Sequence, residues 1–159
     1  MTNNPTTTFI DLKLLDARVQ LPTKATPGSA GFDLQAAIHK PEFIHQGDYR
    51  LIPTGIAIHI ADPTIVGDIH PRSKKGCKGF GIKNLTGIID SDYQGELMVA
   101  IWNTNPNGGY IRIDPLDTIA QIVFRKIPEV AFRLVSEFKS TSIRGDGGIA
   151  KHEDTRWIE

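Results

Sequence analysis

The sequence has a single cysteine, Cys77, no excess of charge of either sign and no long hydrophobic run. One cysteine excludes an intrachain disulfide, which favours a reducing compartment. Lys and Arg together number 18, as do Asp and Glu, so the broad basic surface of a nucleic-acid-binding protein is not expected. No apolar stretch has the length of a membrane span, and the Asn- and Thr-rich residues 1–8 lack the apolar run of a signal peptide. We therefore expect a soluble, cytoplasmic protein with neither a membrane nor a nucleic acid as partner.

A sustained apolar stripe with a period of 3.6 residues, which indicates an amphipathic helix, is also absent. Proline and glycine recur at a density that leaves little room for long helices. A short helix is conceivable near residues 73–78, but Gly76 disfavours it. The apolar residues instead alternate or form short runs, as β-strands do. These runs cover residues 10–14, 56–60, 97–102, 110–113, 119–124 and 131–135.

Many short strands in a chain of 159 residues predict one compact all-β domain, either a sandwich, a barrel or a jelly roll. Asn107-Gly108-Gly109 before Tyr110 indicates a hairpin-type turn. Residues 140–159 are polar and rich in glycine, which predicts a tail ordered only by a partner or ligand. The expected organisation is a β domain over residues 1–139 and a C-terminal arm over residues 140–159.

The segment Gly87–Glu96 concentrates acidic side chains and a phenol beside apolar runs. Asp90 and Asp92 lie at positions i and i+2, and Tyr93 follows directly. In an extended strand the two carboxylates share one face, whereas a tight turn splays them apart. Asp-Ser-Asp is ordinary turn chemistry, but three acids and a tyrosine are more than a turn requires.

Two segments have the composition of phosphate-binding loops. Arg72 and Ser73 follow Pro71, and an arginine fork with a neighbouring hydroxyl suits phosphate oxygens. Arg144 adjoins the glycine-rich residues 145–148, whose backbone N–H groups could wrap a phosphate. A solvated basic loop and a flexible tail are the alternatives for these two segments.

Three further positions carry polar groups that require a partner. Asp33 enters a strand after the glycine-containing segment 28–36. The amide of Asn84 offers both a donor and an acceptor, as the edge of a pyrimidine does. Gln121 lies inside the apolar run 119–123, where an unpaired amide would be costly, so it needs a structural partner or a ligand.

In this order and spacing, these five segments resemble those of the homotrimeric dUTPases, the dUTP nucleotidohydrolases, from about Leu14 to Gly148. The resemblance implies a jelly-roll-like β-barrel with at most a short helix. It implies a homotrimer with three sites between subunits, and a flexible C-terminal arm that closes over a neighbouring subunit's site. It also implies Mg²⁺-assisted hydrolysis of dUTP to dUMP and pyrophosphate, which keeps uracil out of DNA and supplies dUMP.

The resemblance also implies roles for individual residues. Asp90 corresponds to the general base that activates the water attacking the α-phosphorus, and Asp33 to the group that holds Mg²⁺ through water. Tyr93 would pack under the deoxyribose, and the backbone of residues 84–89 would read the uracil edge. The implied substrate-binding residues are Arg72, Ser73, Lys74, Asn84, Gly87, Ile89, Tyr93, Met98, Gln121, Arg144, Gly147, Gly148 and Ile149.

The chain departs from the family pattern at three places. Ile149 stands where the family usually has a phenylalanine that stacks on uracil. Lys74, Lys75 and Gly76 stand where an apolar residue and alanine usually follow the Arg-Ser pair, and Thr118 replaces an arginine. From the missing aromatic ring at Ile149 we expect weaker closure of the arm or lower turnover, and Lys74 and Lys75 make the site more basic.

The altered arm motivates an alternative: a catalytically weakened protein on the dUTPase scaffold that acts as a nucleotide-binding regulator. The retained Asp90 argues against it, because a binding protein needs no water-activating carboxylate. A dCTP deaminase would need an additional catalytic Glu, for which no pattern is recognisable. A structural jelly-roll subunit would leave the phosphate-type segments unexplained.

Overall fold

The computed structural model describes residues 7–140, 142, 143 and 145. The chain divides into two units, Met1–Pro128 and Glu129–Glu159, which are considered separately. The expected boundary between residues 139 and 140 stays a prediction. None of the described helices is long and apolar enough to cross a membrane.

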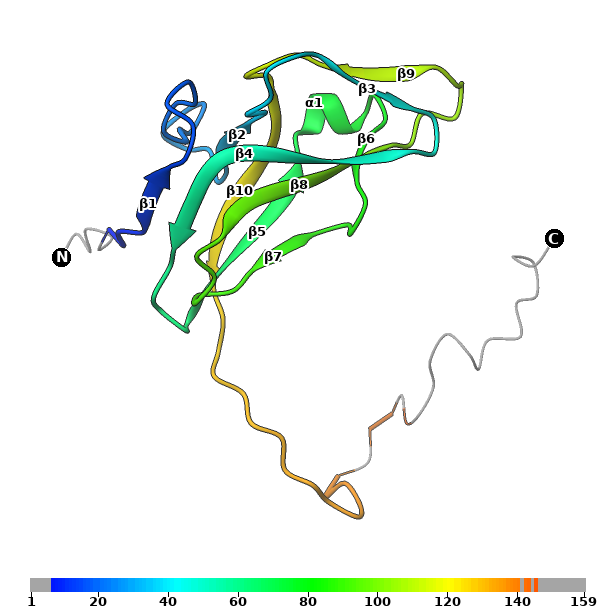
Figure 1. The fold of residues 1–159 in the computed structure, drawn as a ribbon. Coiled ribbons are helices and arrows are strands. Elements are labelled where there is room, and N and C mark those ends of the chain that lie inside the picture. Colours follow the sequence, from blue (N-terminus) through cyan, green and yellow to red (C-terminus); the bar gives the residue numbers. More distant parts are fainter. Residues whose placement is uncertain (1–6, 141, 144, 146–159) are drawn as a thin grey trace. The chain divides into compact units, whose positions relative to one another are not determined.

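Within its described residues, the first unit contains ten strands and one short helix (Figure 1). The strands are β1 (Asp11–Leu14), β2 (Phe32–Gln35), β3 (Glu42–His45), β4 (Tyr49–His59), β5 (Ile65–Pro71), β6 (Phe80–Ile82), β7 (Gly87–Ile89), β8 (Glu96–Asn103), β9 (Tyr110–Ile113) and β10 (Thr118–Lys126), and the helix is α1 (Ser73–Gly76). The expectation of an all-β fold with at most a short helix is confirmed.

The strands form two four-stranded sheets and one two-stranded sheet, all antiparallel. The first sheet has the order β1-β4-β8-β6 and the second the order β2-β10-β5-β7, while β3 pairs with β9. Consecutive strands often lie in different sheets, as β6 and β7 do, which is the connectivity of a jelly-roll-like fold. Strands far apart in the sequence are thereby placed side by side, notably β10 between β2 and β5.

The core is built largely from isoleucine, leucine and valine side chains. Strand β8 shows why: Leu97, Val99, Ile101 and Asn103 are buried, while the residues between them are only partly covered. This alternation follows from the two-residue period of a strand that has one buried face. The burial of these branched side chains supplies the main driving force for folding.

Two expectations from the sequence need correction. The turn at Asn107-Gly108-Gly109 forms, with positive φ at both glycines, but β9 pairs with β3 and not with the preceding β8. The apolar run 131–135 is not a strand in the single chain. A strand requires a neighbouring strand to pair its backbone groups, and the described residues of this chain supply none for that run.

Two polar side chains are buried in the core and satisfy their hydrogen-bonding groups there. The Thr54 hydroxyl donates to the carbonyl of Leu97 at 2.6 Å. The Asn103 amide donates to the carbonyl of Ile44 at 2.9 Å, and its oxygen accepts from the N–H of Asn105. These bonds tie β4 to β8 and β8 to β3, because a buried polar group without a partner would be costly.

Thr54→Val should lower the free energy of unfolding by about 1–3 kcal/mol, because the buried carbonyl of Leu97 loses its donor while the volume of the side chain is kept. Urea unfolding of wild type and variant measures the difference. Thr104→Val is the matched control, since its hydroxyl bonds the carbonyl of Gly79 at an exposed residue. Equal effects of the two substitutions would contradict the prediction.

Candidate active site

Strand β10 brings together residues from three of the polar segments. Its pairing with β2 places Thr118 opposite Gln35 and Ala120 opposite Leu34, which leaves Ile119 as an extra residue. This bulge puts Gln121 opposite Asp33 on one side and His70 of β5 on the other. A regular ladder would have placed Ala120 opposite Asp33, so the bulge determines which side chain reaches the site.

A cluster of Asp33, Arg72 and Gln121 results from this register. Oδ1 of Asp33 lies 2.8 Å from Nη1 of Arg72. The Gln121 amide donates from Nε2 to the carbonyl of Pro71 at 3.1 Å. Gln121 is half-buried in β10, and the structural partner expected for its amide is therefore the backbone just before Arg72.

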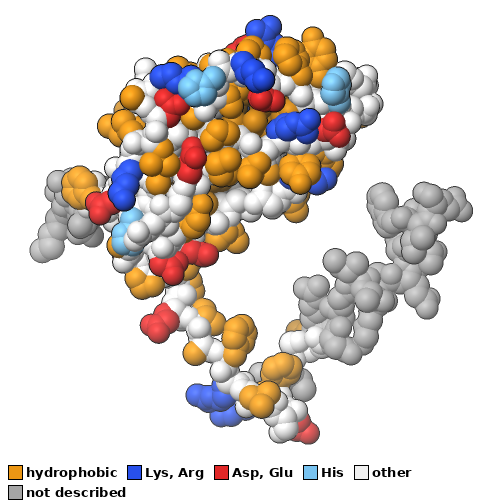
Figure 2. All heavy atoms as spheres, viewed as in Figure 1, with side chains coloured by type: hydrophobic (Ala, Val, Ile, Leu, Met, Phe, Trp, Pro, Cys, Tyr) orange, Lys and Arg blue, Asp and Glu red, His pale blue; other side chains and the backbone are white. Residues whose placement is uncertain are grey.

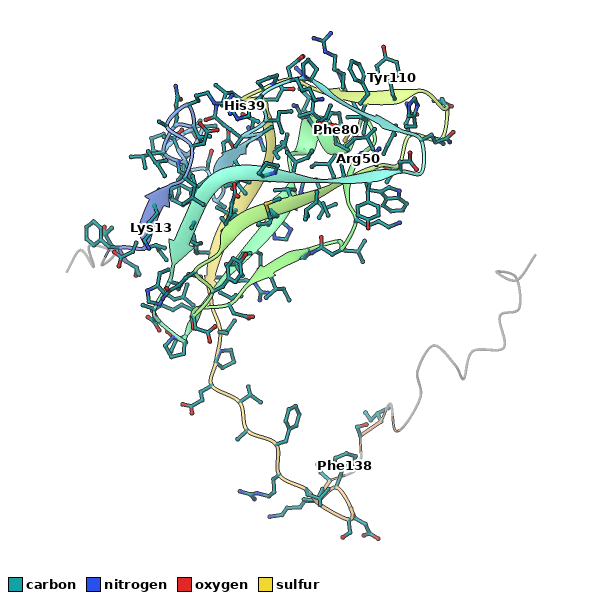
Figure 3. All side chains as sticks on the ribbon, viewed as in Figure 1. Lys13, His39, Arg50, Phe80, Tyr110 and Phe138 are labelled. Atoms are coloured by element: carbon teal, nitrogen blue, oxygen red, sulfur yellow. The ribbon has the colours of Figure 1, made fainter. Side chains whose placement is uncertain are left out.

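The two lysines that follow Arg72 and Ser73 have different surroundings. Ser73 begins helix α1, and Ser73 and Lys74 are exposed. Lys75 instead pairs with Asp117 (Nζ to Oδ2, 3.3 Å) and lies over the ring of Phe80 at 5.1 Å from its centroid; Phe80 is labelled in Figure 3. Of these two lysines, Lys74 is available to a ligand, while Lys75 fastens α1 to the loop before β10.

A second group of candidate residues surrounds a small cavity between the two sheets. Asn84, Gly87 and Met98 line it, together with apolar residues that include Ile69. Its volume is about 70 Å³. The structure thus brings together three residues that the resemblance gave as substrate-binding. Strands β6 and β7 flank this region but pair with β8 and β5, so they do not form a hairpin with each other.

Asp90 and Tyr93 follow β7 in a turn. The N–H of Tyr93 donates to the carbonyl of Asp90 at 3.2 Å, which favours the turn over the extended alternative for the two carboxylates. Asp90 is exposed, and Ile89 directly before it is half-buried. The Tyr93 hydroxyl donates to the carbonyl of Glu96 at 2.9 Å.

Two residues that the sequence did not assign to the site hold Tyr93 in place. A Cβ on Gly95 would lie 2.7 Å from Cζ of Tyr93, so only glycine leaves room for the ring. The Glu96 carboxylate accepts the N–H of Gly55 at 2.8 Å and anchors the start of β8 to β4. The glycine after Tyr93 is visible in the sequence, but nothing in the sequence gives the direction of the ring.

A second pair of opposite charges, Asp68 and Arg125, lies on the same two strands, β5 and β10. Asp68, which is buried, accepts from Nε of Arg125, and this hydrogen bond raises the pKa of Arg125. The other oxygen of Asp68 has no hydrogen-bond partner among the described residues. No pattern in the sequence indicates this pair, because it depends on the register between β5 and β10.

Asp90 and Arg72 lie toward opposite ends of β5, whereas Gly87 pairs with Ile69 between them. Ile89 pairs with Gly67, and Pro71 is four residues further along the strand. Asp90 and Arg72 each lie one residue further out, so they are separated by roughly 20 Å at about 3.3 Å per residue. Arg144, Gly147, Gly148 and Ile149 lie outside the described residues.

The donor set fits a magnesium ion that is held mainly by other ligands. Among the described residues, no group of three or more His, Cys, Asp or Glu side chains is arranged around a common metal position. Mg²⁺ needs no such cage, because it keeps several waters and binds substrate phosphates with one or two carboxylates. Oδ1 of Asp33 is covered and ion-paired with Nη1 of Arg72, so its carboxylate can accept from such an ion's water only when Arg72 takes another anionic partner.

Residues 17–152 match the family model described as dUTPase. The deoxyuridine 5'-triphosphate nucleotidohydrolase of Laribacter hongkongensis is 51% identical over 142 residues, which cover 87% of this chain and 93% of that protein. The chain therefore belongs to the dUTPase family.

Solved structures agree on the fold. The dUTPase of Staphylococcus bacteriophage 80alpha with dUPNHPP has a TM-score of 0.78 and 25% identity, covering 91% of this chain and 98% of that chain. The dUTPase of phage phi11 of S. aureus, studied for the coordination of a structural Mg(II) ion, has a TM-score of 0.73 and 24% identity, covering 83% and 99%. The expected jelly-roll-like architecture is therefore confirmed.

Lys75→Gln should lower the free energy of unfolding slightly, by about 0.2–1 kcal/mol, because its partners are partly exposed. Lys74→Gln should leave that free energy unchanged, since the described residues give Lys74 no ion-pair partner. Chemical unfolding of both variants tests this division of roles. A larger loss for Lys74→Gln than for Lys75→Gln would show that the assignment is wrong.

Proposed function

We propose that this protein hydrolyses dUTP to dUMP and pyrophosphate. The observation that carries the proposal is the cluster of Asp33, Arg72 and Gln121 on neighbouring strands, in a chain that belongs to the dUTPase family. An arginine fork, a hydroxyl and a free lysine at one sheet edge are the groups that bind a polyphosphate. Asn84, Gly87 and Met98 line a separate cavity, which we assign to the base.

In this mechanism, Asp90 acts as the general base. It orients a water and accepts a proton from it as the water oxygen bonds the α-phosphorus. The bond from the α-phosphorus to the bridging oxygen breaks, and pyrophosphate leaves. The exposed position of Asp90 at the end of β7 allows this approach. Phosphoryl transfer relies chiefly on position and charge neutralisation, so Arg72, Ser73 and Gln121 contribute by holding the phosphates.

Specificity for the deoxynucleoside comes from Tyr93 and from the backbone of residues 84–89. Tyr93, seated against Gly95, packs under the deoxyribose and leaves no space for a 2′-hydroxyl. The backbone from Asn84 to Ile89 reads the uracil edge. Asp33 holds the water shell of Mg²⁺, which when bound neutralises charge on the phosphates. Arg144 and residues 147–149 of the arm complete the closed site.

The active protein is a homotrimer whose sites combine residues of two chains. Asp90 acts at the α-phosphorus and Ser73 at the neighbouring bridge, so both must lie within a few ångströms of one substrate. Arg72, directly before Ser73, lies roughly 20 Å from Asp90 along β5, which prevents this within one chain. A second copy that presents its Asp90 to the Arg72 and Ser73 of the first removes the conflict.

Apolar surface on both units supports self-association. In the first unit, an open groove of about 550 Å³ is lined by Leu12, Phe32 and Phe124 among others. Hydrophobic side chains also gather over β4 and β8 on the face shown in Figure 2. Leu51 of β4 is among the exposed hydrophobic residues. In the second unit, Phe132 is fully exposed. Contiguous apolar surface of this kind marks interaction sites.

We place the reaction in the cytoplasm, because the single cysteine suits a reducing compartment. The alternative of a nucleotide-binding regulator rests on Ile149 in the arm, which lies outside the described residues. Turnover of dUTP distinguishes the enzyme from a regulator that only binds it.

Asp90→Asn should lower kcat for pyrophosphate release from dUTP by about 10²- to 10⁴-fold, the range for loss of a general base. The assay uses Mg²⁺ and compares dUTP with UTP, dTTP and dCTP. Asp92→Asn is the matched control, because it removes an exposed carboxylate from the same turn. Absence of wild-type turnover, or equal losses in the two variants, would refute the proposed mechanism.

Co-expression of Asp90→Asn and Arg72→Ala chains should restore activity that neither variant has alone. If each site takes Asp90 from one chain and Arg72 from another, random mixing leaves about a quarter of the sites intact. Purification through two different tags selects the mixed assemblies, and dUTP turnover measures recovery.

The control for this experiment pairs Arg72→Ala with Gln121→Ala. Both residues belong to the same group around β10, so no combination of these chains contains an intact group. Recovery in this control, or its absence in mixed Asp90→Asn and Arg72→Ala assemblies, would exclude the composite site.

A further inference from the structure

The Gln121 side chain joins three segments that are far apart in the sequence. Its Nε2 donates to the carbonyl of Pro71 at 3.1 Å. Its other face lies against Gly31, where an added Cβ would be 3.0 Å from Cδ and 3.1 Å from Cβ of Gln121. Asp33, opposite Gln121 in the β2–β10 pairing, reaches Arg72 at 2.8 Å. The amide therefore lies where these three segments meet.

Gly31 is required for space rather than for backbone conformation. It is buried and does not have a positive φ. An added Cβ would come still closer to Oε1 of Gln121 than to its carbons. An alanine at residue 31 can therefore be accommodated only if Gln121 moves, and that movement breaks its hydrogen bond to Pro71.

We propose that Gly31 and Gln121 act as a pair that positions Arg72 and Ser73. The hydrogen bond holds the peptide that joins Pro71 to Arg72, so it fixes the direction in which the chain leaves β5. Gln121 is a positioning residue in this role, whatever its own contact with phosphate. The inference deepens the proposed function, since it concerns how the phosphate-binding residues are held.

A double-mutant cycle between residues 31 and 121 tests the pair. Gly31→Ala should lower kcat/KM for dUTP by about tenfold or more, because small misplacements of binding groups are costly. Gly28→Ala is the matched control in the same loop, where an added Cβ meets nothing within 4 Å, and should change kcat/KM by no more than about twofold.

The coupling is the decisive readout. In a Gln121→Ala background, Gly31→Ala should have little further effect, because the added Cβ then has room. Gln121→Glu keeps the size of the side chain but cannot donate to Pro71, so it should lose as much activity as Gln121→Ala. Additive losses in the cycle, or a Gly31→Ala effect no larger than that of Gly28→Ala, would overturn the proposal.

A second measurement separates this inference from the proposed function. The same four chains are compared by urea unfolding, which does not depend on substrate or chemistry. A non-additive change in the free energy of unfolding supports the pair even if wild type fails to hydrolyse dUTP. Additive changes overturn it even if wild type is fully active.

Discussion

The register of β10 is the constraint on which the site depends. Its bulge at Ile119 lets two successive residues, Ile119 and Ala120, point into the core. Gln121 then faces outward between Asp33 and His70. A shift of one residue would bury the amide and expose the isoleucines, so the apolar core itself enforces the register. The geometry of the cluster of Asp33, Arg72 and Gln121 is thus held by burial on the opposite face of the same strand.

The same sheet links function to assembly. β5 carries the phosphate-binding group at its C-terminal end and pairs near its start with the end of β7, which precedes Asp90. Because β5 and β7 are antiparallel, Asp90 after β7 lies near the start of β5, and Arg72 follows its other end. The two residues needed for one reaction are therefore kept apart within a chain. Association of copies is then a requirement of the proposed chemistry rather than an addition to it. Exposed apolar residues such as Leu51 and Phe132 provide surface that association can bury.

The sequence predicts the all-β class because apolar residues alternate in residues 10–14 and 56–60 and form short runs such as 97–102, separated by dense turn signals. It also identifies Asp33, Arg72 and Gln121 as chemically informative residues, and the structure brings these three together. The partners of the strands are not predictable in this way: the turn before Tyr110 says nothing about β3. The sequence also does not predict which residues make room for the site side chains. Glycine is needed at residue 31 because Gln121 lies against it, and at residue 95 because the ring of Tyr93 does, and both contacts appear only in three dimensions.

Within the cluster of Asp33, Arg72 and Gln121, the ion pair can exchange partners, whereas the hydrogen bond of Gln121 to the backbone cannot. Asp33 and Arg72 neutralise each other across β10, and both are partly exposed, so a polyanionic substrate can replace the carboxylate as the partner of Arg72. The released carboxylate is then free to accept from the water shell of Mg²⁺. Gln121 has no such alternative, because its partner is a backbone carbonyl that stays in place. Under the proposed function, the exchange of charged partners therefore takes place on a frame that Gln121 and Gly31 keep constant.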